Sequence, residues 1–158
     1  MYRPTSKHTS VKEAQKQMEH FCAYQERCHQ EVFEKLRALR MIPTAIDQIM
    51  THLIQENYLN EERFAKSFAR GKFRIKKWGK KRIVQELKQR KISMYNIKGA
   101  LSEIEEEDYL QTLDELAKKR LSQLTETNIQ KRKKKLADYL LYRGWESDLV
   151  YAKIQELI

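Results

Sequence analysis

The apolar residues of this chain recur at two nearly equal spacings, of 51 and then 53 residues. Helical periodicity alone would align some positions at any shift, but here the expected turns coincide as well. The aligned sets are Val32, Ile83 and Leu136; Leu36, Leu87 and Leu140; Met41, Ile92 and Trp145; Ile46, Ile97 and Val150; Met50, Leu101 and Ile154; Leu53, Ile104 and Leu157; and, at the first spacing only, Phe33 with Val84 and Tyr58-Leu59 with Tyr109-Leu110. This repeat predicts three tandem structural units of about 50 residues each.

Each unit is expected to contain three helices, because its apolar residues are mostly three or four positions apart. The chain has only 4 Gly and 2 Pro, which leaves few tight turns, and no segment alternates as a strand does. The expected helices run over about 11–27, 30–40 and from Pro43 onward in the first unit; 60–77, 80–91 and 94–104 in the second; and 106–123, 128–142 and 146–157 in the third.

The sequence therefore predicts an all-α fold of three tandem three-helix, helix-turn-helix-like repeats that form an elongated, curved array. A unit of about 50 residues buries little apolar surface by itself, so neighbouring repeats should share interfaces. The predicted division is a disordered N-terminus over 1–10, then repeats over 11–58, 59–105 and 106–158, the central one being basic.

Local capping signals support several of the predicted helix starts. Ser10 and Glu13 have the spacing of a capping box, in which each side chain accepts a backbone N–H of the other. Pro43 cannot continue the helix before it and suits the first turn of the helix that follows. Asn60 is placed to cap the first helix of the second unit.

Positive charge is concentrated in the second unit. Residues 60–99 contain 14 Lys and Arg against 3 Glu, whereas the whole chain has a net charge of +10, so the rest of the chain is close to neutral. A field of one sign over so short a segment indicates a polyanionic partner or an acidic protein groove. The alternative, an ordinary solvated helix face, would be expected to carry more acidic neighbours.

A helix over 60–77 would place its basic side chains in a stripe roughly 60° wide. The stripe comprises Arg63, Lys66, Arg70, Arg74 and Lys77, with Lys72 on the same basic helix; Phe64, Phe68 and Ile75 are predicted to face the core. Phe73 is predicted on the flank of the stripe, and Trp78 follows it. Lys80, Lys81 and Arg82 then crowd the start of the next helix, where positive charge opposes the helix dipole.

These residues suit contacts to phosphate, which give affinity without reading sequence. Phe73 or Trp78 could stack on a nucleobase, although core packing is the expected role of Trp78. A second basic cluster, with candidate contacts Lys131, Arg132 and Lys134, opens the middle helix of the third unit, where a solubilising role is the alternative. The acidic residues over 103–108 are expected to favour the start of the next helix, and a switchable contact with the basic residues is a further option.

The segment YLNEERFAKSFARGK, followed by WGKKRIVQELKQRKI, resembles the central signature of the RecX family of recombinase regulators. The matching residues are Tyr58, Leu59, Arg63, Phe64, Ala65, Arg70, Gly79, Ile83, Glu86, Leu87 and Ile92. The segment over 22–36 is similar to the family's first-unit motif through Arg27, Glu31, Val32 and Leu36. The chain departs from the family in the turn after the middle helix, where only Gly144 keeps the usual glycine, which leaves the turn geometry open.

The resemblance implies the three-by-three helical plan and a regulator that binds RecA in the groove of its filament on single-stranded DNA. We expect this regulator to be a monomer and not an enzyme. The resemblance also implies limits on strand exchange, ATPase and coprotease activity, and a role in DNA repair, recombination and the SOS response. Single-stranded DNA is an expected partner, with double-stranded DNA as a further option. Of the contact surface, the resemblance carries over only the basic central unit. The alternative is a RecA-independent, non-specific DNA-binding helical module.

Other chemistry has little support in the sequence. His20, Cys22, Cys28 and His29 lack the spacing of a zinc site, and neither a phosphate loop nor a nucleophile motif is present, so we expect no metal, no cofactor and no catalytic residue. Cys22 is expected in the core and Cys28 in a turn. The absence of an apolar run or a leader-like N-terminus leads us to expect a cytoplasmic protein without a membrane partner.

Overall fold

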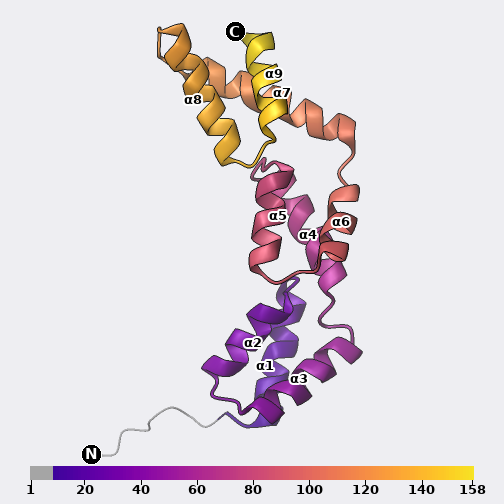
Figure 1. Cartoon of the computed structure of the whole chain (residues 1–158). Helices are drawn as coiled ribbons and strands as arrows, with labels where there is room; N and C mark the ends of the chain where they lie inside the picture. The colour runs from indigo at the N-terminus through magenta and orange to yellow at the C-terminus, as the bar shows by residue number, and fades with distance from the viewer. Residues whose placement is uncertain (1–8) are drawn as a thin grey trace, which may run out of the picture. The chain divides into compact units, whose positions relative to one another are not determined.

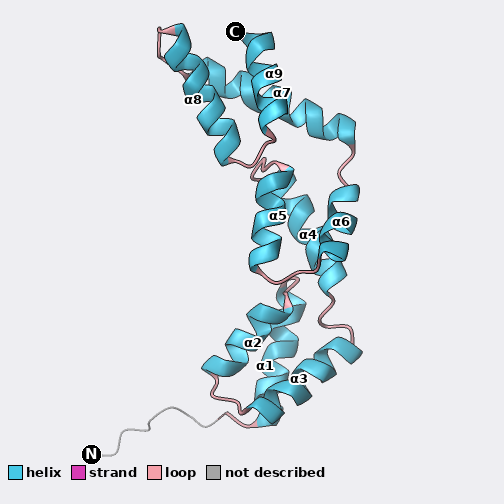
Figure 2. Ribbon diagram, viewed as in Figure 1, coloured by secondary structure: helices cyan, strands magenta, loops and turns pink. Residues whose placement is uncertain are grey.

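The computed structural model describes residues 9–158, and over that range the chain contains nine α-helices and no strand (Figures 1 and 2). The predicted all-α helical-repeat fold is confirmed. The helices are α1 (Val11–Tyr24), α2 (His29–Ala38), α3 (Pro43–Gln55), α4 (Glu61–Arg74), α5 (Lys80–Gln89), α6 (Met94–Ser102), α7 (Glu106–Gln123), α8 (Ile129–Tyr142) and α9 (Ser147–Leu157). None of these described helices is long and apolar enough to cross a bilayer. The disorder predicted for 1–10 falls almost wholly on residues 1–8, outside the described part.

The chain divides into two compact units that differ from the three predicted repeats. From here on, the first unit is the part that ends at Phe64, and the second unit is Ala65–Ile158. The boundary lies within α4, so the first unit contains α1, α2, α3 and the first turn of α4. The second unit contains the rest of α4 together with α5 to α9. The finer division into three repeats stays a prediction.

The first unit is built on the apolar faces of α1, α2 and α3. Its buried cluster comprises Ala14, Met18, Cys22, Val32, Leu36, Ile46, Ile49, Leu53 and Leu59. The predicted helix starts are confirmed: the Glu13 backbone N–H donates to Ser10 Oγ at 3.1 Å, and Pro43 is the first residue of α3. Cys28 caps α2, where its backbone N–H and thiol both donate to the Glu31 carboxylate.

In the second unit, aromatic residues from two helices and from the connection between α8 and α9 meet in the core. Tyr109 of α7 is almost fully buried, and its ring centroid lies 4.5 Å from that of Trp145 and 5.8 Å from that of Phe73. Its hydroxyl accepts the Lys80 backbone N–H at 2.8 Å and donates to the Glu146 carboxylate, the N-cap of α9. Burial and the bond to Glu146 raise the pKa of Tyr109 well above its ordinary value, so the phenol stays a neutral donor.

The turns before α5 and before α9 contact each other directly through their backbones. The Gly79 N–H donates to the Arg143 carbonyl at 2.8 Å, and the Lys81 N–H donates to the Gly144 carbonyl at 3.0 Å. The Trp145 indole N–H donates to the Lys77 carbonyl at 3.0 Å. At the start of α5, which has no side-chain cap, the N–H groups of Gly79, Lys80 and Lys81 are therefore satisfied by tertiary contacts.

The turn after the middle helix has the same geometry in each predicted repeat. Arg40, Lys91 and Gly144 all adopt positive φ, at 61°, 59° and 89°. The next residue in each case, Met41, Ile92 or Trp145, donates its N–H to the carbonyl of Leu36, Leu87 or Leu140, at 3.1, 3.1 and 3.2 Å. This is the hydrogen bond of a Schellman C-cap, which explains why both positions are apolar in all three repeats. The loss of glycine in the first two turns has not altered the turn.

One part of the predicted repeat alignment is wrong. Tyr58 and Leu59 precede α4, with Leu59 buried and Tyr58 partly so, whereas Tyr109 and Leu110 lie inside α7, with Tyr109 buried and Leu110 41% exposed. The two dipeptides therefore differ in both secondary structure and orientation. The similarity arose because each lies near the start of the first helix of a repeat.

Candidate polyanion-binding surface

The basic helix α4 is shorter than the sequence predicted. It ends at Arg74, and Lys77 lies in the connection to α5 with a φ of 59°. Lys77 therefore does not belong to the helical stripe, although its side chain is exposed just beyond the end of α4. The prediction that Ile75 faces the core is also wrong, because Ile75 is 78% exposed just beyond the end of the helix.

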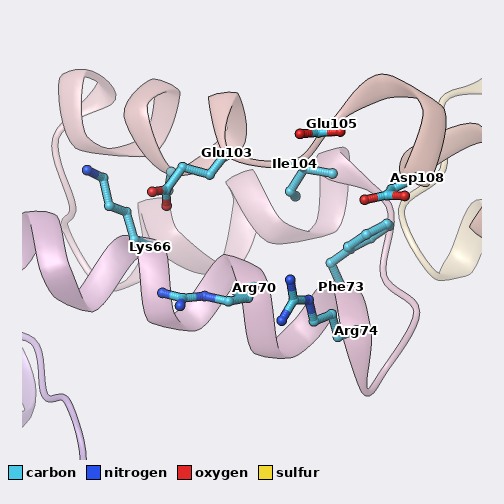
Figure 3. A pocket seen from close by; sticks show the side chains of 9 residues that line it. Lys66, Arg70, Phe73, Arg74, Glu103, Ile104, Glu105 and Asp108 are labelled. Atoms are coloured by element: carbon cyan, nitrogen blue, oxygen red, sulfur yellow. The ribbon is translucent and has the colours of Figure 1, made fainter.

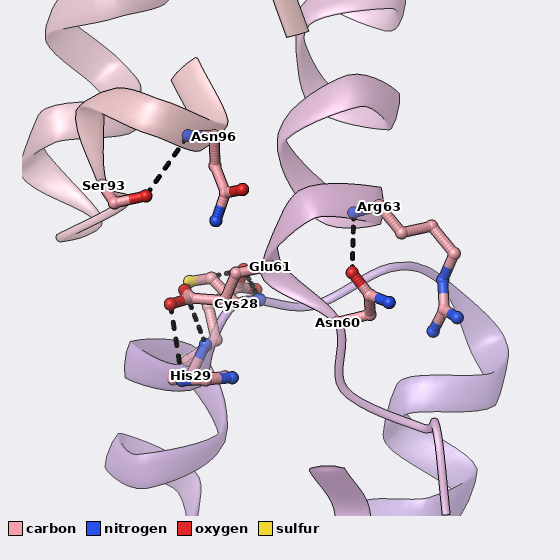
Figure 4. A network of polar contacts seen from close by, with 8 residues as sticks. Cys28, His29, Asn60, Glu61, Arg63, Ser93 and Asn96 are labelled. Carbon is pink, nitrogen blue, oxygen red and sulfur yellow. Dashed lines mark hydrogen bonds and ion pairs between the residues drawn. The ribbon is translucent and has the colours of Figure 1, made fainter. Parts of the chain in front are cut away.

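Arg63 differs from the rest of the predicted stripe because its guanidinium already binds protein groups in the first unit. Its Nε lies 2.7 Å from Glu26 Oε1, and its Nη2 donates to the Asn57 carbonyl at 3.0 Å. Its backbone N–H donates to Asn60 Oδ1 at 3.0 Å, which confirms the predicted helix cap (Figure 4). Arg63 thus fastens the start of α4 within its own unit.

Glu61 adds a second link of this kind. Its carboxylate accepts the His29 backbone N–H at 3.4 Å and lies 3.4 Å from the His29 ring, as Figure 4 shows. In the same figure, Ser93 Oγ accepts the Asn96 backbone N–H, an N-cap of α6 that belongs to the second unit by itself. The first turn of α4 is therefore held by structural contacts, and the free positive charge lies further along the helix.

Four exposed cations of the second unit form what we call the basic face: Arg70, Arg74, Lys77 and Lys81. Among residues 9–158, no carboxylate lies within ion-pair distance of any of them. Their charges are therefore compensated only by solvent and by more distant groups. A surface of this kind binds polyanions because it gains counterion release without first breaking internal pairs.

A pocket of 230 Å³ separates α4 from an acidic segment of the same unit. Lys66, Arg70 and Arg74 line one side, and Glu103, Glu105 and Asp108, which we call the acidic wall, line the other (Figure 3). Phe73 and Ile104 lie between them. Asp108 also belongs to the first turn of α7, where negative charge favours the helix start as predicted. The acidic wall thus lies across from the basic face, and a switchable contact between them stays a prediction.

Phe73 is not available to stack on a base, so that prediction is wrong. It is 7% exposed and packs on Tyr109, which the sequence could not show because the two residues belong to different predicted repeats. Trp78 is partly buried and meets Phe68 edge-on at 6.3 Å. The Lys72 ammonium and the Arg82 guanidinium lie 5.0 and 4.3 Å from its ring centroid, so Trp78 takes part in packing and cation–π contacts.

The other predicted cations are in mixed surroundings. Lys80 lies 4.6 Å from the Tyr109 ring centroid, and Arg82 is half-buried between Trp78 and Tyr142. In the second cluster, Lys131 and Lys134 are exposed and Arg132 is half-buried, while Lys134 pairs with Asp138 at 2.8 Å. An exposed pair of this type is worth little and is easily exchanged for another anion. This cluster is therefore a weaker candidate than the basic face.

The two cysteines are structural. Cys22 and Cys28 are both buried, as predicted for Cys22, and both are free thiols. Burial is the main cause that raises the pKa of each from 9.0 to about 11. At neutral pH neither is a reactive thiolate.

The fold and the charge distribution define a helical-repeat protein whose second unit carries a basic face. Comparison with known proteins identifies the family: residues 60–101 match the second three-helix domain of RecX, and residues 106–154 match the third. These two matches cover more than half of the chain. The protein belongs to the RecX family.

Curated relatives agree with this assignment. The protein is 27% identical over 138 residues to "Regulatory protein RecX" of Oceanobacillus iheyensis, covering 87% of this chain and 51% of the relative. It is 35% identical over 103 residues to "Regulatory protein RecX" of Yersinia pseudotuberculosis, covering 65% of this chain and 55% of the relative. The chain spans about half the length of the curated relatives it matches.

Solved structures share the fold. The crystal structure of RecX from Lactobacillus salivarius superposes with a TM-score of 0.80 at 24% identity, covering 93% of this chain and 96% of the other. A second structure, described as that of regulatory protein RecX, gives a TM-score of 0.82 at 23% identity over 92% of this chain and 73% of the other.

Proposed function

We propose that this protein regulates RecA by binding in the groove of the RecA filament on single-stranded DNA. Binding there would limit strand exchange, ATPase and coprotease activity. Membership of the RecX family and relatives named as regulatory proteins support the proposal. The observation that carries it is the basic face, whose four cations have no carboxylate partner among the described residues.

The proposed mechanism is electrostatic and steric. Arg70, Arg74, Lys77 and Lys81 would contact phosphate or acidic protein surface, while the helical body occupies the groove and blocks incoming duplex DNA. The ionic partner must be a strong one, because it competes with the acidic wall on the other side of the pocket. A polyanion meets that condition, since many phosphates act together whereas the wall has three carboxylates.

The test is RecA-dependent ATP hydrolysis on single-stranded DNA, with and without this protein. We expect substoichiometric protein to suppress hydrolysis, and the triple variant Arg70→Gln, Arg74→Gln and Lys77→Gln to suppress it much less while keeping its helical content. A matched variant removes three exposed charges elsewhere, with Lys12→Gln, Lys16→Gln and Lys119→Gln, and should act as the parent does. Equal inhibition by the parent and both variants would count against the basic face.

A RecA-independent DNA-binding module is the second candidate, favoured by the same unpaired cations. The two are distinguished by measuring DNA affinity in the absence of RecA as a function of salt. Each phosphate contact to a single strand contributes about −0.7 to the slope of log affinity against log salt. Strong, salt-dependent DNA binding without any effect on RecA would favour this second candidate.

A further inference from the structure

We propose that Tyr142 is a stacking platform for an unpaired nucleobase, set between two cation-lined hollows that take the adjoining phosphates of single-stranded nucleic acid. The inference rests on the DNA-binding part of the proposed function and gives it a specific site. It also replaces Phe73, which is buried, and Trp78, which is partly buried, as the aromatic group for that role.

Tyr142 is held in place but remains open. It is the last residue of α8 and is 73% exposed. The Arg82 guanidinium carbon lies 4.8 Å from its ring centroid, and Arg82 Nη1 donates to the Tyr142 carbonyl at 3.3 Å. Arg82 therefore supports the ring from one side, while the large exposed fraction leaves ring surface for a ligand. An aromatic ring backed by a guanidinium is a typical surface for base stacking.

The first hollow, of 420 Å³, lies between α5 and the end of α8. Tyr142 lines it together with Lys81 and Arg82, which can bind phosphate, and with Gln85 and Gln89, whose amides can both donate to and accept from a base edge. Glu86 also lines this hollow, but its carboxylate is paired with Arg90 at 3.0 Å. The volume is within the range of small-molecule sites, enough for one nucleotide.

The second hollow, of 680 Å³, shares Tyr142 with the first. Arg120, Arg143 and Lys135 line it, and the two guanidiniums lie 4.7 and 3.9 Å from the ring centroid of Tyr139. Lys135 is 3.4 Å from Glu126, and the one lining carboxylate, Asp138, is paired with Lys134 at 2.8 Å. Positive charge therefore prevails in this hollow as well as in the first.

This arrangement favours a single strand over the other polyanions. In a duplex the bases are stacked on one another, so no base is available to stack on the exposed Tyr142 ring. A single strand can turn a base outward onto that ring. An acidic protein surface would be satisfied by the cations alone and gives no reason for the tyrosine between them. The alternation of cations, aromatic ring and cations has the order of phosphate, base and phosphate along a strand.

The test compares two labelled strands of about 16 nucleotides, the upper end of common site sizes: an oligothymidine and an abasic strand with the same phosphates. Affinities are measured by fluorescence anisotropy. We expect the parent protein to bind the oligothymidine more tightly. Tyr142→Ala should lose about 5- to 150-fold for oligothymidine, as expected for one stacked base, and should bind the abasic strand as the parent does.

Two further variants separate stacking from a general disturbance. Tyr142→Phe keeps the ring and should retain the parent's preference for oligothymidine. Tyr95→Ala removes another tyrosine of the same unit, 82% exposed on α6 and lining neither hollow, and should change nothing. Circular dichroism verifies that each variant is folded.

Several results would overturn the inference. They are equal affinity of the parent for the two strands, a loss by Tyr142→Ala that is the same for both strands, and no loss for either. A parent that binds neither strand would overturn it too. The RecA-dependent hydrolysis assay remains a separate readout, so regulation of RecA can stand while this site fails, and the reverse.

Discussion

Replacement of Gly144 by alanine tests the backbone contact on which the second unit depends. An added Cβ would lie 2.3 Å from Arg82 Cβ and 2.4 Å from the Arg82 backbone nitrogen, and Gly144 has a φ of 89°. The neighbour at 2.4 Å is backbone in the first turn of α5, so a side-chain rotation cannot relieve the overlap. The two turns must move apart instead.

This substitution destabilises the folded second unit in two ways. An L-residue with this φ costs about 1–2 kcal/mol relative to glycine. Separation of the turns weakens the Gly79-to-Arg143 and Lys81-to-Gly144 hydrogen bonds, at about 0.5–1.5 kcal/mol each. We therefore expect Gly144→Ala to lower the free energy of unfolding of the second unit by about 2–5 kcal/mol.

Urea unfolding followed by tryptophan fluorescence measures the free energy of unfolding of the second unit directly. The chain has 2 Trp, Trp78 and Trp145, and both lie in the second unit, so the signal reports on that unit and not on the first. Gly71→Ala is the matched control, because nothing lies within 4 Å of its added Cβ inside α4. It should raise stability by up to about 1 kcal/mol. A loss below about 0.5 kcal/mol for Gly144→Ala, within the range of an ordinary surface substitution, would refute the reasoning.

Three further predictions concern the turns, the acidic wall and the cysteines. Lys91→Gly should stabilise the second unit by about 0.5–1 kcal/mol, because glycine adopts a positive φ without strain. Lys88→Gly, inside α5, should destabilise the second unit by about 1 kcal/mol. The midpoint of urea unfolding measures both changes, and a shift in the same direction for both variants would contradict the turn assignment. The double variant Glu103→Gln and Glu105→Gln should tighten binding of a single-stranded oligonucleotide about 2- to 5-fold at low salt. The control is the double variant Glu34→Gln and Glu115→Gln, which should bind as the parent does. An unchanged affinity of the first double variant would contradict this prediction. Because the pKa values of Cys22 and Cys28 are raised to about 11 from 9.0, the folded state favours the protonated thiols. The free energy of unfolding of the first unit should therefore be unaffected by these thiols below pH 9 and should fall as the pH rises from 9 toward 11. Cys22→Ala should make that fall less steep.

Much of the local structure follows from the sequence. The spacing of apolar residues indicates each of the nine helices over residues 9–158, although α4 ends earlier than predicted. Ser10, Pro43 and Asn60 mark helix starts that the structure has. The repeat even locates the C-caps, since Met41, Ile92 and Trp145 recur as the residues that close them. These features depend on neighbours within a few positions along the chain, and such interactions are written in the sequence pattern itself.

Other features depend on partners far away in the chain. Arg63 pairs with Glu26, 37 positions earlier, and Phe73 is buried because Tyr109 packs against it. Neither contact has a spacing that a helical wheel reveals. For the same reason the sequence does not indicate the proposed platform at Tyr142, because Arg82 lies 60 positions before it.

The sequence by itself determined that the chain is helical and repeated, and that its positive charge is gathered over residues 60–99. Only the tertiary structure decided which cations are free and which aromatic ring is open. Helix formation responds to the period of apolar side chains, which is local. The availability of a charge or a ring for a partner depends on which distant groups already occupy it, and only packing sets that.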